Sequence, residues 1–423
     1  MKIFDLSKQM EEALREASKR GLEDLEKAVE VVRPIVMAVK ERGDEAVKAY
    51  DKKFSRVACD YEIKVSRSEV EEAYSRVDQG FVRALRKAIE VVTRFHEEER
   101  PRPWIKELVN GLRAGVIPRP VDVAGLYIPG GRAPYPSTAV MAGVPAKVAG
   151  VDRLVACSPP GPDGKLNPYV LVALNEVGVD EVYRAGGAQA IAAMAYGTES
   201  VAKVDVIAGP GNIYVTAAKH LVSHVVGIDV LAGPSELLII ADESADPSLV
   251  AIDLASQAEH DPLAQVALAA TRPDIVKRVV EGLEPLAKES SVVEEVLKER
   301  FIAVYGSREE LVEFANAYAP EHLQLMVSRP EEYVDEIKAA GVLLVGARAP
   351  TALSDYCAGP SHVLPTGRCS RFRSGVSTLT FTKFMHYVEV VGAGEEIYRA
   401  ALKLAEVEGF RLHAESLRRR LVV

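Results

Sequence analysis

The sequence predicts an α/β fold with two consecutive parallel-sheet modules, preceded by a helical arm and followed by a helical tail. From about residue 119, short runs rich in branched apolar residues end at Gly or Pro and are followed by helical stretches of small residues. Before that point, as in residues 23–54, apolar residues recur at spacings of three and four among many charges, which is typical of amphipathic helices. The same helical spacing returns in residues 394–423.

The helical arm is expected over residues 1–105, with Pro34 as a kink or turn, and the first module over residues 106–235. In this module an apolar run leads into each turn that contains Gly or Pro, and a helix follows most of these turns. The strands with their turns are expected at 121–131, 153–161, 180–187 and 204–212, and the helices at 136–150, 188–197 and 213–223.

The second module is expected over residues 236–375. Its strands are predicted at 235–242, 264–271, 301–307, 322–328 and 341–346, and its helices at 308–318 and 331–340. A further helix begins with Asp246 as its N-cap and Pro247 in its first turn and continues toward residue 257. Residues 376–423 form the tail, with an amphipathic helix and a second, shorter one.

Composition excludes several classes of protein. A chain of 423 residues with 48% hydrophobic and 27% charged residues is typical of a soluble globular protein, and no apolar run reaches the roughly 20 residues of a membrane span. The first residues alternate charged and apolar side chains, so we expect a cytoplasmic protein. The net charge of −9 argues against nucleic acid as a partner. The four cysteines are far apart and form no CxxC pair, so neither a disulfide framework nor a thiolate zinc cluster is expected.

Gln257 and His260 are three residues apart, and on a helix this spacing puts both side chains on one face, where they can converge on one ion. Asp355 and His413 would complete such a site. A mixed oxygen and nitrogen ligand set suits zinc better than magnesium or calcium. By itself, a Gln and His pair is more often an ordinary polar pair on a helix face, so the hypothesis depends on the motifs around it.

Three further motifs supply acid and base groups. Glu321 and His322 are adjacent, and His362 and Glu408 stand in motifs of their own. Ligands of open α/β sheets gather at the carboxyl ends of strands, so we expect Glu321 and His322 there, and Asp355 and His362 in the loop after the strand at 341–346. Each has an ordinary reading as well: Glu321 and His322 as an ion pair at a helix end, His362 as a core residue, and the glycine pairs at 130–131 and 186–187 as turns.

Eight motifs, in the order LYIPGG, GGAQAIAA, GPGN, AGPSE, SQAEHDP, APEHL, DYCAGPSHVLPT and EGFRLHA, extend from about residue 125 to 415. On these motifs the chain closely resembles the histidinol dehydrogenases. The resemblance implies two incomplete Rossmann-like modules of the aldehyde-dehydrogenase-like kind. It also implies a zinc enzyme that oxidises L-histidinol through the aldehyde to L-histidine with two NAD, as the last steps of histidine biosynthesis. Finally, it implies a homodimer of intertwined subunits, in which the tail reaches the partner's active site.

The resemblance also assigns residues. Glu321 and His322 would be catalytic, and the zinc ligands would be Gln257, His260, Asp355 and His413. Substrate contacts would be Ser235, Gln257, His260, His322, Asp355, Tyr356, His362, Glu408 and His413, and cofactor contacts Tyr127, Gln189 and Asn212. An imidazole suits the removal of the alcohol proton, so His322 is expected as the base, while Glu321 would activate water for aldehyde oxidation.

Three features qualify this assignment. Pro360 and Ser361 precede His362 where the family commonly has other residues, and the segment 373–381 also departs from the family pattern. GPGNIY supplies only part of a dinucleotide fingerprint, so the NAD expectation depends on the resemblance. The alternatives are a paralogous dehydrogenase acting on another amino or sulfonated alcohol, a zinc hydrolase without NAD, and a binding protein that keeps the fold.

Overall fold

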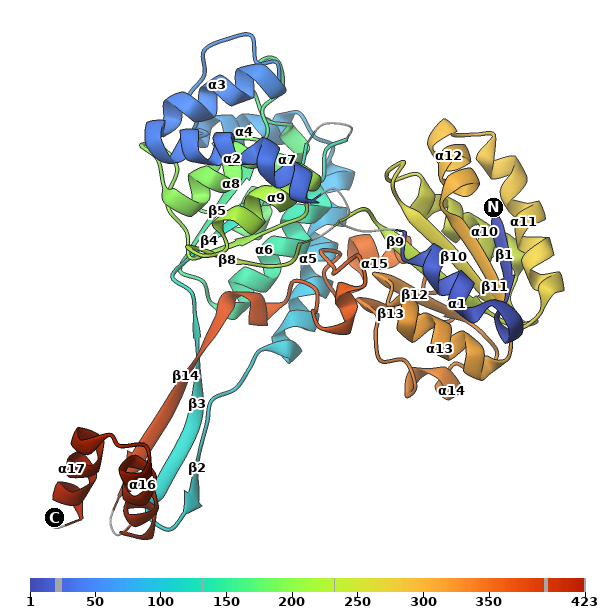
Figure 1. Ribbon diagram of the computed structural model, residues 1–423. Helices are drawn as coiled ribbons and strands as arrows, with labels where there is room; N and C mark the ends of the chain where they lie inside the picture. Colours follow the sequence, from blue (N-terminus) through green and yellow to red (C-terminus); the bar gives the residue numbers. More distant parts are fainter. Residues whose placement is uncertain (20–24, 131–132, 232, 392–394, 422–423) are drawn as a thin grey trace. The chain divides into compact units, whose positions relative to one another are not determined.

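The computed structural model describes residues 1–19, 25–130, 133–231, 233–391 and 395–421. It divides into two compact units (Figure 1). The first unit comprises Met1–Arg100 and Val121–Phe381, and the second Pro101–Pro120 and Thr382–Val423. Within the described ranges, no helix is long and apolar enough to cross a membrane.

The first sheet is wholly parallel and has the strand order β6-β5-β4-β7-β8. Its strands are β4 (Val123–Tyr127), β5 (Arg153–Ser158), β6 (Glu181–Arg184), β7 (Val206–Ala208) and β8 (Gly227–Ile228). The helices that connect them are α6 (Pro136–Ala149), α7 (Pro168–Val177), α8 (Gly187–Tyr196) and α9 (Ile213–Val222). The strand order reverses between β4 and β7, and this topological switch point is where open α/β sheets bind their ligands.

Most of the N-terminal segment covers this first sheet. Its helices are α2 (Leu25–Arg42), α3 (Asp44–Phe54), α4 (Arg67–Ser75) and α5 (Gln79–Glu99). Helices α2 and α3 pack on α8, and α2 also packs on α9, whereas α4 and α5 pack on α7 and α5 also on α6. Two separate hydrophobic cores result, one for each face of the sheet. Pro34 lies inside α2, which continues through it.

The second sheet is also parallel and has the order β1-β11-β10-β9-β12-β13. Its strands are β1 (Lys2–Asp5), β9 (Glu236–Ala241), β10 (Gln265–Ala270), β11 (Phe301–Tyr305), β12 (His322–Met326) and β13 (Val342–Val345). The α-helices of this module are α1 (Leu6–Ala17), α10 (Pro247–Ala258), α11 (Pro273–Ala287), α12 (Ser291–Glu299), α13 (Arg308–Tyr318), α14 (Glu331–Val334) and α15 (Thr351–Cys357). Two 3-10 turns, η1 (Cys369–Arg371) and η2 (Thr378–Phe381), follow. The predicted two-module α/β class is therefore confirmed.

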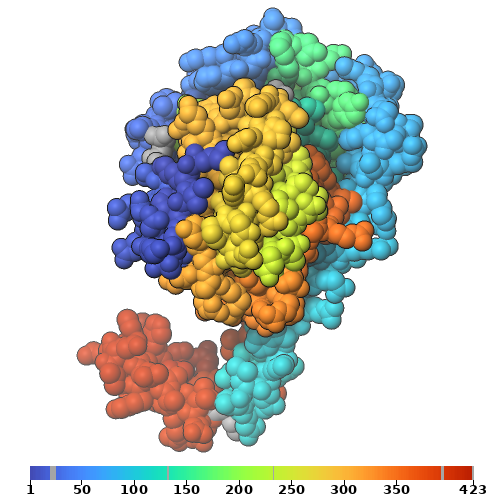
Figure 2. Space-filling view, turned by 90° about the vertical axis from the view of Figure 1, so that its right-hand side faces the viewer, coloured from blue at the N-terminus to red at the C-terminus, as the bar shows by residue number. Residues whose placement is uncertain are grey.

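Two predicted elements need correction. Residues 1–105 were expected to be helical, yet Lys2–Asp5 forms the edge strand β1 beside β11, and α1 packs on α13. Figure 2 shows these first residues, in dark blue, lying against the second module. The strand is short and buries Phe4, so its pattern was too brief to read. The helix predicted for residues 331–340 is confined to Glu331–Val334, because only Tyr333 of this turn is buried.

The second unit contains an antiparallel sheet that the sequence did not predict, together with the two expected tail helices. The sheet has the order β14-β3-β2, with β2 (Trp104–Val109), β3 (Leu112–Pro120) and β14 (Thr382–Val390), and the helices are α16 (Glu395–Val407) and α17 (Arg411–Arg420) (Figure 1). Among the described residues of this unit, the buried apolar side chains are Ala405 and Ala414 alone. Large apolar side chains are exposed instead, namely Trp104, Ile105, Leu108, Val109, Phe384, Met385, Val388, Val390, Val391, Ile397, Leu404, Val407, Phe410 and Leu412.

Candidate active site

The three expected cofactor residues lie at the carboxyl edge of the first sheet. Tyr127 ends β4, Asn212 is the N-cap of α9 after β7, and Gln189 lies in the first turn of α8. The Tyr127 hydroxyl oxygen accepts a hydrogen bond from the backbone N–H of Gly187 at 3.0 Å. Burial raises the pKa of Tyr127 to about 12, so the phenol keeps its proton and can donate it. This edge contains the switch point where a dinucleotide would bind.

The loop between β7 and α9 is fixed by a buried ion pair. Gly209 has φ +126°, and a Cβ atom there would lie 2.1 Å from the carbonyl oxygen of Tyr127, so only glycine fits. Its N–H donates to Asp229 Oδ2 at 2.8 Å, and its carbonyl accepts from Lys219 Nζ. Lys219 Nζ and Asp229 Oδ1 are 2.6 Å apart, with both side chains buried. Neither residue of this pair was predicted from the sequence to have a role.

The N-terminus of α9 faces outward from the same loop. The Asn212 side-chain oxygen caps the helix by accepting from the N–H groups of Tyr214 and Val215, at 3.1 and 3.2 Å. A capped helix start next to a glycine turn offers backbone N–H groups and a positive dipole end, which together favour an anionic ligand. The diphosphate of a dinucleotide has the matching charge.

Glu321 and His322 stand at the start of β12, beside the start of β9. Our expectation that they lie at carboxyl strand ends was wrong, because α13 delivers the chain to the amino edge of the second sheet. Glu321 Oε2 accepts the backbone N–H of Glu236 at 2.8 Å. In return, the Glu236 carboxylate accepts the N–H of Glu321 at 3.3 Å and that of Gly367 at 2.8 Å. Glu236 was missed, although a carboxylate that opens the fully buried strand ELLIIA was a readable signal.

His322 is 2% exposed and lies between carboxylates. Its Nδ1 is 3.2 Å from the Glu236 carbonyl oxygen and 3.6 Å from Glu321 Oε2, and its Nε2 is 3.3 Å from Asp355 Oδ1. Burial alone would lower the pKa of His322, but the negative charges of Glu321 and Asp355 outweigh it and raise this pKa to about 10. Burial alone would raise the pKa of the Asp355 carboxyl, but the hydrogen bond and positive charge of His322 outweigh it and lower this pKa. In this arrangement His322 carries a proton.

His362 is held as a neutral imidazole near the same carboxylate. The backbone carbonyl of Asp355, which can only accept, lies 2.9 Å from His362 Nδ1, so this nitrogen carries the proton. His362 Nε2 therefore accepts from the Thr138 hydroxyl in α6, at 3.2 Å. Burial lowers the pKa of His362, which agrees with this neutral form. Asp355 thus contacts two histidines, of which His322 is protonated and His362 is neutral.

Gln257 is buried in the last turn of α10, and His260 follows that helix on the surface. Helix α10 contacts α15, which carries Asp355, and His260 contributes to lowering the pKa of the Asp355 carboxyl. Ser235 immediately precedes β9, where its carbonyl accepts from the Gln265 N–H, and Tyr356 is 59% exposed. Over the part of the chain that the structure describes, no three His, Cys, Asp or Glu side chains are arranged to hold a metal ion.

Glu408 and His413 belong to the second unit. Glu408 follows α16, and His413 lies in the first turn of α17 with its ring centroid 5.3 Å from that of Phe410. Both side chains are exposed within this unit. The structure therefore gathers Glu321, His322, Asp355 and His362 in the first unit and leaves the two tail residues available on the surface of the second.

A dinucleotide-type switch point in one parallel module, and a buried Glu–His pair in the other, are features of an α/β dehydrogenase. Comparison with known proteins identifies which kind. The family model for histidinol dehydrogenase matches residues 18–421. The chain belongs to the histidinol dehydrogenase family, and it is an NAD-dependent oxidoreductase.

Individual relatives agree over nearly the whole length. The histidinol dehydrogenase of Methanothermobacter thermautotrophicus is 44% identical over 413 residues, covering 96% of this chain and 97% of that protein. The histidinol dehydrogenase of Methanocaldococcus jannaschii is 43% identical, covering 99% of this chain and 98% of that protein. Among solved structures, the histidinol dehydrogenase of Elizabethkingia anophelis superposes with a TM-score of 0.93 at 36% identity, covering 100% of this chain and 98% of that one.

Proposed function

We propose that this enzyme carries out the four-electron oxidation of L-histidinol, through L-histidinal, to L-histidine, with reduction of two NAD at a zinc-dependent site. The observation that supports this most directly is the buried Glu321–His322 pair beside Asp355, in a chain of this family. Tyr127, Gln189 and Asn212 would hold the cofactor. Ser235, Tyr356 and His362 would contact the substrate, together with Glu408 and the metal ligands.

Two different proton transfers are needed. In the first step the alcohol loses a hydride to NAD and its hydroxyl proton to a base, and we assign the base to His322. The second step oxidises the aldehyde hydrate, so Glu321 would take a proton from the attacking water. The 3.6 Å between Glu321 Oε2 and His322 Nδ1 supports this role, because the acid and base of the two steps would then be neighbours.

His322 can act as a base only when it is neutral, which requires that its raised pKa be relieved. Asp355 is one of the two carboxylates that raise this pKa, and it is also an expected metal ligand. A carboxylate engaged by a cation attracts an imidazole proton less strongly. The Asp355 side chain thus links the charge state of His322 to occupation of the metal site.

The residues present fit zinc. Gln257 and His260 at the end of α10, with Asp355 on the adjoining α15, offer the mixed oxygen and nitrogen set that zinc accepts, and His413 would be the fourth ligand. When bound, zinc would supply a positive charge that orients and polarises the substrate. His260 is exposed, as a residue that meets a ligand from another chain would be.

We further propose a homodimer whose second unit completes the neighbouring site. The supporting observation is that this unit buries only Ala405 and Ala414 among its described apolar side chains and exposes fourteen large ones. Such a surface is typical of an obligate interface. Glu408 and His413 would then serve the partner's site. The proposal assigns the enzyme to the cytoplasm and includes neither nucleic acid nor membrane as a partner.

The decisive experiment counts NADH, by absorbance at 340 nm, for each L-histidinol consumed. A ratio of about two, lost on chelation and restored by zinc, is the expected result, because metal binding is linked to the site. A ratio of one would instead indicate a simple alcohol dehydrogenase, and no NADH would point to hydrolase or binding functions. His322→Ala should slow alcohol oxidation, and Glu321→Gln should slow aldehyde oxidation alone. Equal losses in both steps for both variants would refute the division of roles.

A further inference from the structure

Asp51 is a buried carboxylate that the catalytic proposal does not use. It lies in α3 and is 0% exposed. Its Oδ1 accepts hydrogen bonds from the Gly186 backbone N–H at 3.1 Å and from Gln189 Nε2 at 2.7 Å. Its Oδ2 accepts from the Tyr61 hydroxyl at 2.7 Å. All three of these neighbours donate, so Asp51 acts as an acceptor that binds the turn before α8 to the N-terminal segment.

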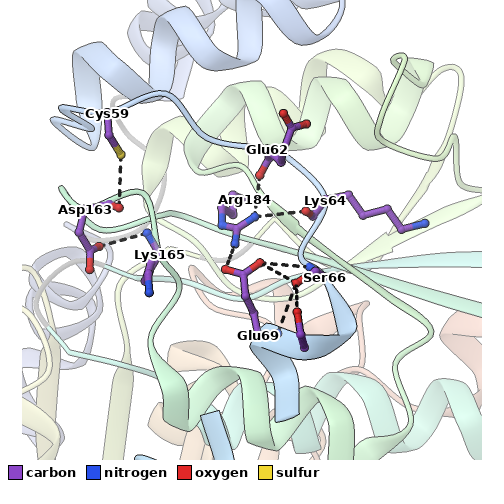
Figure 3. Close-up of polar contacts among 9 residues, drawn as sticks. Cys59, Glu62, Lys64, Ser66, Glu69, Asp163, Lys165 and Arg184 are labelled. Atoms are coloured by element: carbon purple, nitrogen blue, oxygen red, sulfur yellow. Dashed lines mark hydrogen bonds and ion pairs between the residues drawn. The ribbon is translucent and has the colours of Figure 1, made fainter. Parts of the chain in front are cut away.

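The chain beyond Asp51 is separately attached to the same module. Figure 3 shows Arg184, at the end of β6, donating to the carbonyl oxygens of Glu62 and Lys64, at 2.6 and 3.2 Å. The same guanidinium pairs with Glu69. Lys64 also forms an antiparallel bridge with Tyr183 of β6, the edge strand of the first sheet. Residues 61–69 are therefore fixed along this edge, and the Tyr61–Asp51 contact has a rigid support.

The contact with Asp51 determines which way the Gln189 amide points. A carboxylate oxygen can only accept, so the amide group that faces it must be the NH2. The other end of the amide, Oε1, is then directed away from Asp51. Gln189 is 1% exposed, and this oxygen has no hydrogen-bond partner among the described residues. A buried acceptor without a partner is unfavourable by itself and is expected where a ligand supplies the missing donor.

We propose that Asp51 is a positioning residue for the cofactor: it orients Gln189 so that Oε1 receives a hydrogen bond from an N–H or O–H group of NAD. This rests on the proposed function, in which Gln189 is a cofactor contact. The group bound there is a ribose hydroxyl or an amino group of the dinucleotide. It is not a phosphate oxygen, because an anionic acceptor would face another acceptor. The phosphates belong at the N-terminus of α9 instead.

The first test measures the equilibrium affinity for NADH in the absence of histidinol, with NADH fluorescence as the signal. Asp51→Ala releases the Gln189 amide and should weaken NADH binding about tenfold, within the range of one lost oriented hydrogen bond. Asp51→Asn keeps Oδ1 as the acceptor for Gly186 and Gln189 and turns its NH2 to Tyr61, so it should retain affinity within about threefold. The KM for histidinol should stay unchanged in both.

A matched control separates positioning from stability. Tyr61→Phe removes the hydrogen bond to Oδ2 of the same carboxylate and leaves those from Gly186 and Gln189 to Oδ1 in place. It should lower the unfolding temperature and leave NADH affinity unchanged. If Tyr61→Phe weakens NADH binding as much as Asp51→Ala does, Asp51 acts on the fold in general and the proposal is wrong.

A double-mutant cycle supplies the strictest outcome. If Asp51 acts through Gln189, the Asp51→Ala and Gln189→Leu double variant should bind NADH as Gln189→Leu alone does. Losses that simply add would overturn the proposal. A set of dinucleotide analogues that each lack one donor group identifies the donor. The analogue that lacks the group bound by Gln189 should bind wild type and Asp51→Ala equally. If every analogue keeps the tenfold difference in affinity between these two proteins, the donor assignment fails. A protein that binds NADH in this pattern but does not oxidise histidinol would contradict only the proposed function.

Discussion

Replacing Lys219 by Met tests whether the buried ion pair with Asp229 fixes the loop between β7 and α9. The variant keeps most of the side-chain volume but leaves Asp229 as a buried carboxylate with the Gly209 N–H as its one remaining described partner. The side chains of Lys219 and Asp229 are 3% and 1% exposed, so solvent cannot replace the lost ammonium. Breaking a buried ion pair in this way costs about 3–5 kcal/mol.

The effect is measured as the midpoint of thermal unfolding, with wild type and variant at the same protein and NAD concentrations. A loss of this size corresponds to a decrease on the order of 5–10 °C. NADH affinity should fall as well, because the Gly209 carbonyl loses its donor beside the switch point.

The matched variant is the double substitution Lys219→Met with Asp229→Asn. It removes the buried charge while keeping a polar group near the Gly209 N–H, so it should recover at least half of the lost unfolding temperature. Two results would refute the claim that this buried pair fixes the loop. One is an unfolding midpoint of the single variant within about 1 °C of wild type, since even about 1 kcal/mol shifts the midpoint by 2 °C or more in domains of ordinary size. The other is a double variant that is less stable than the single one.

Three further predictions follow from individual residues. Glu181, held by Lys64, Arg153 and Tyr183, has a pKa lowered to about 2, because these hydrogen bonds and charges outweigh burial. The stabilisation from ionised Glu181 is therefore present above pH 4.5 and lost as the pH falls toward 2. At pH 7 the free energy of unfolding of wild type should exceed that of Glu181→Gln by about 1–2 kcal/mol, allowing for solvent screening. A difference in unfolding midpoint that does not shrink between pH 5 and pH 2 would contradict this. Gly209→Ala should abolish NADH binding through its contact with Tyr127, whereas Gly346→Ala, at φ +88° with open space around it, should cost only about 1–2 kcal/mol of backbone strain; similar unfolding midpoints for the two variants would argue against the close contact. Mixing inactive His413→Ala subunits with inactive Glu321→Ala subunits should restore part of the activity, and no recovery after proven subunit exchange would rule out sites shared between subunits.

Most strands of the two parallel sheets could be read from the sequence because they are short, largely buried apolar runs, whereas the short edge strands β1 and β8 bury only Phe4 between them and were missed. Residues 236–241 and 265–270 are buried at every position. Strands with one solvent-facing side escaped prediction. In β2 every residue is exposed, and in β14 every residue is exposed or partly exposed, so neither shows the continuous apolar pattern of a core strand. The pairing of β14 with β3 also joins residues more than 260 positions apart, which local patterns do not reveal, whereas β2 and β3 form a local hairpin.

The residues of the candidate site were likewise only partly predictable from the sequence. Motifs indicated Glu321, His322 and Asp355, and in the structure the carboxylates of Glu321 and Asp355 each lie within 4 Å of the His322 imidazole. The sequence could not indicate that Glu236 locks Glu321 in place, that Asp51 reaches Gln189, or that Lys219 pairs with Asp229. These contacts join segments that are distant in the chain, or use residue types that are usually on the surface, so only the folded arrangement identifies them. The roles of the predicted ligands stay predictions.

The pairing of β1 with β11 constrains the order in which the chain can fold during synthesis. Residues 2–5 leave the ribosome well before their partners at 302–305, which are made about 300 residues later. At about 5–20 residues per second, this strand waits roughly 15–60 s without its partner, while the first module, in residues 25–100 and 121–231, can already fold. The second module is thus a discontinuous domain with the first inserted into it. A fusion or deletion at the start of the chain should therefore affect the last stage of folding, when the edge of the second sheet closes.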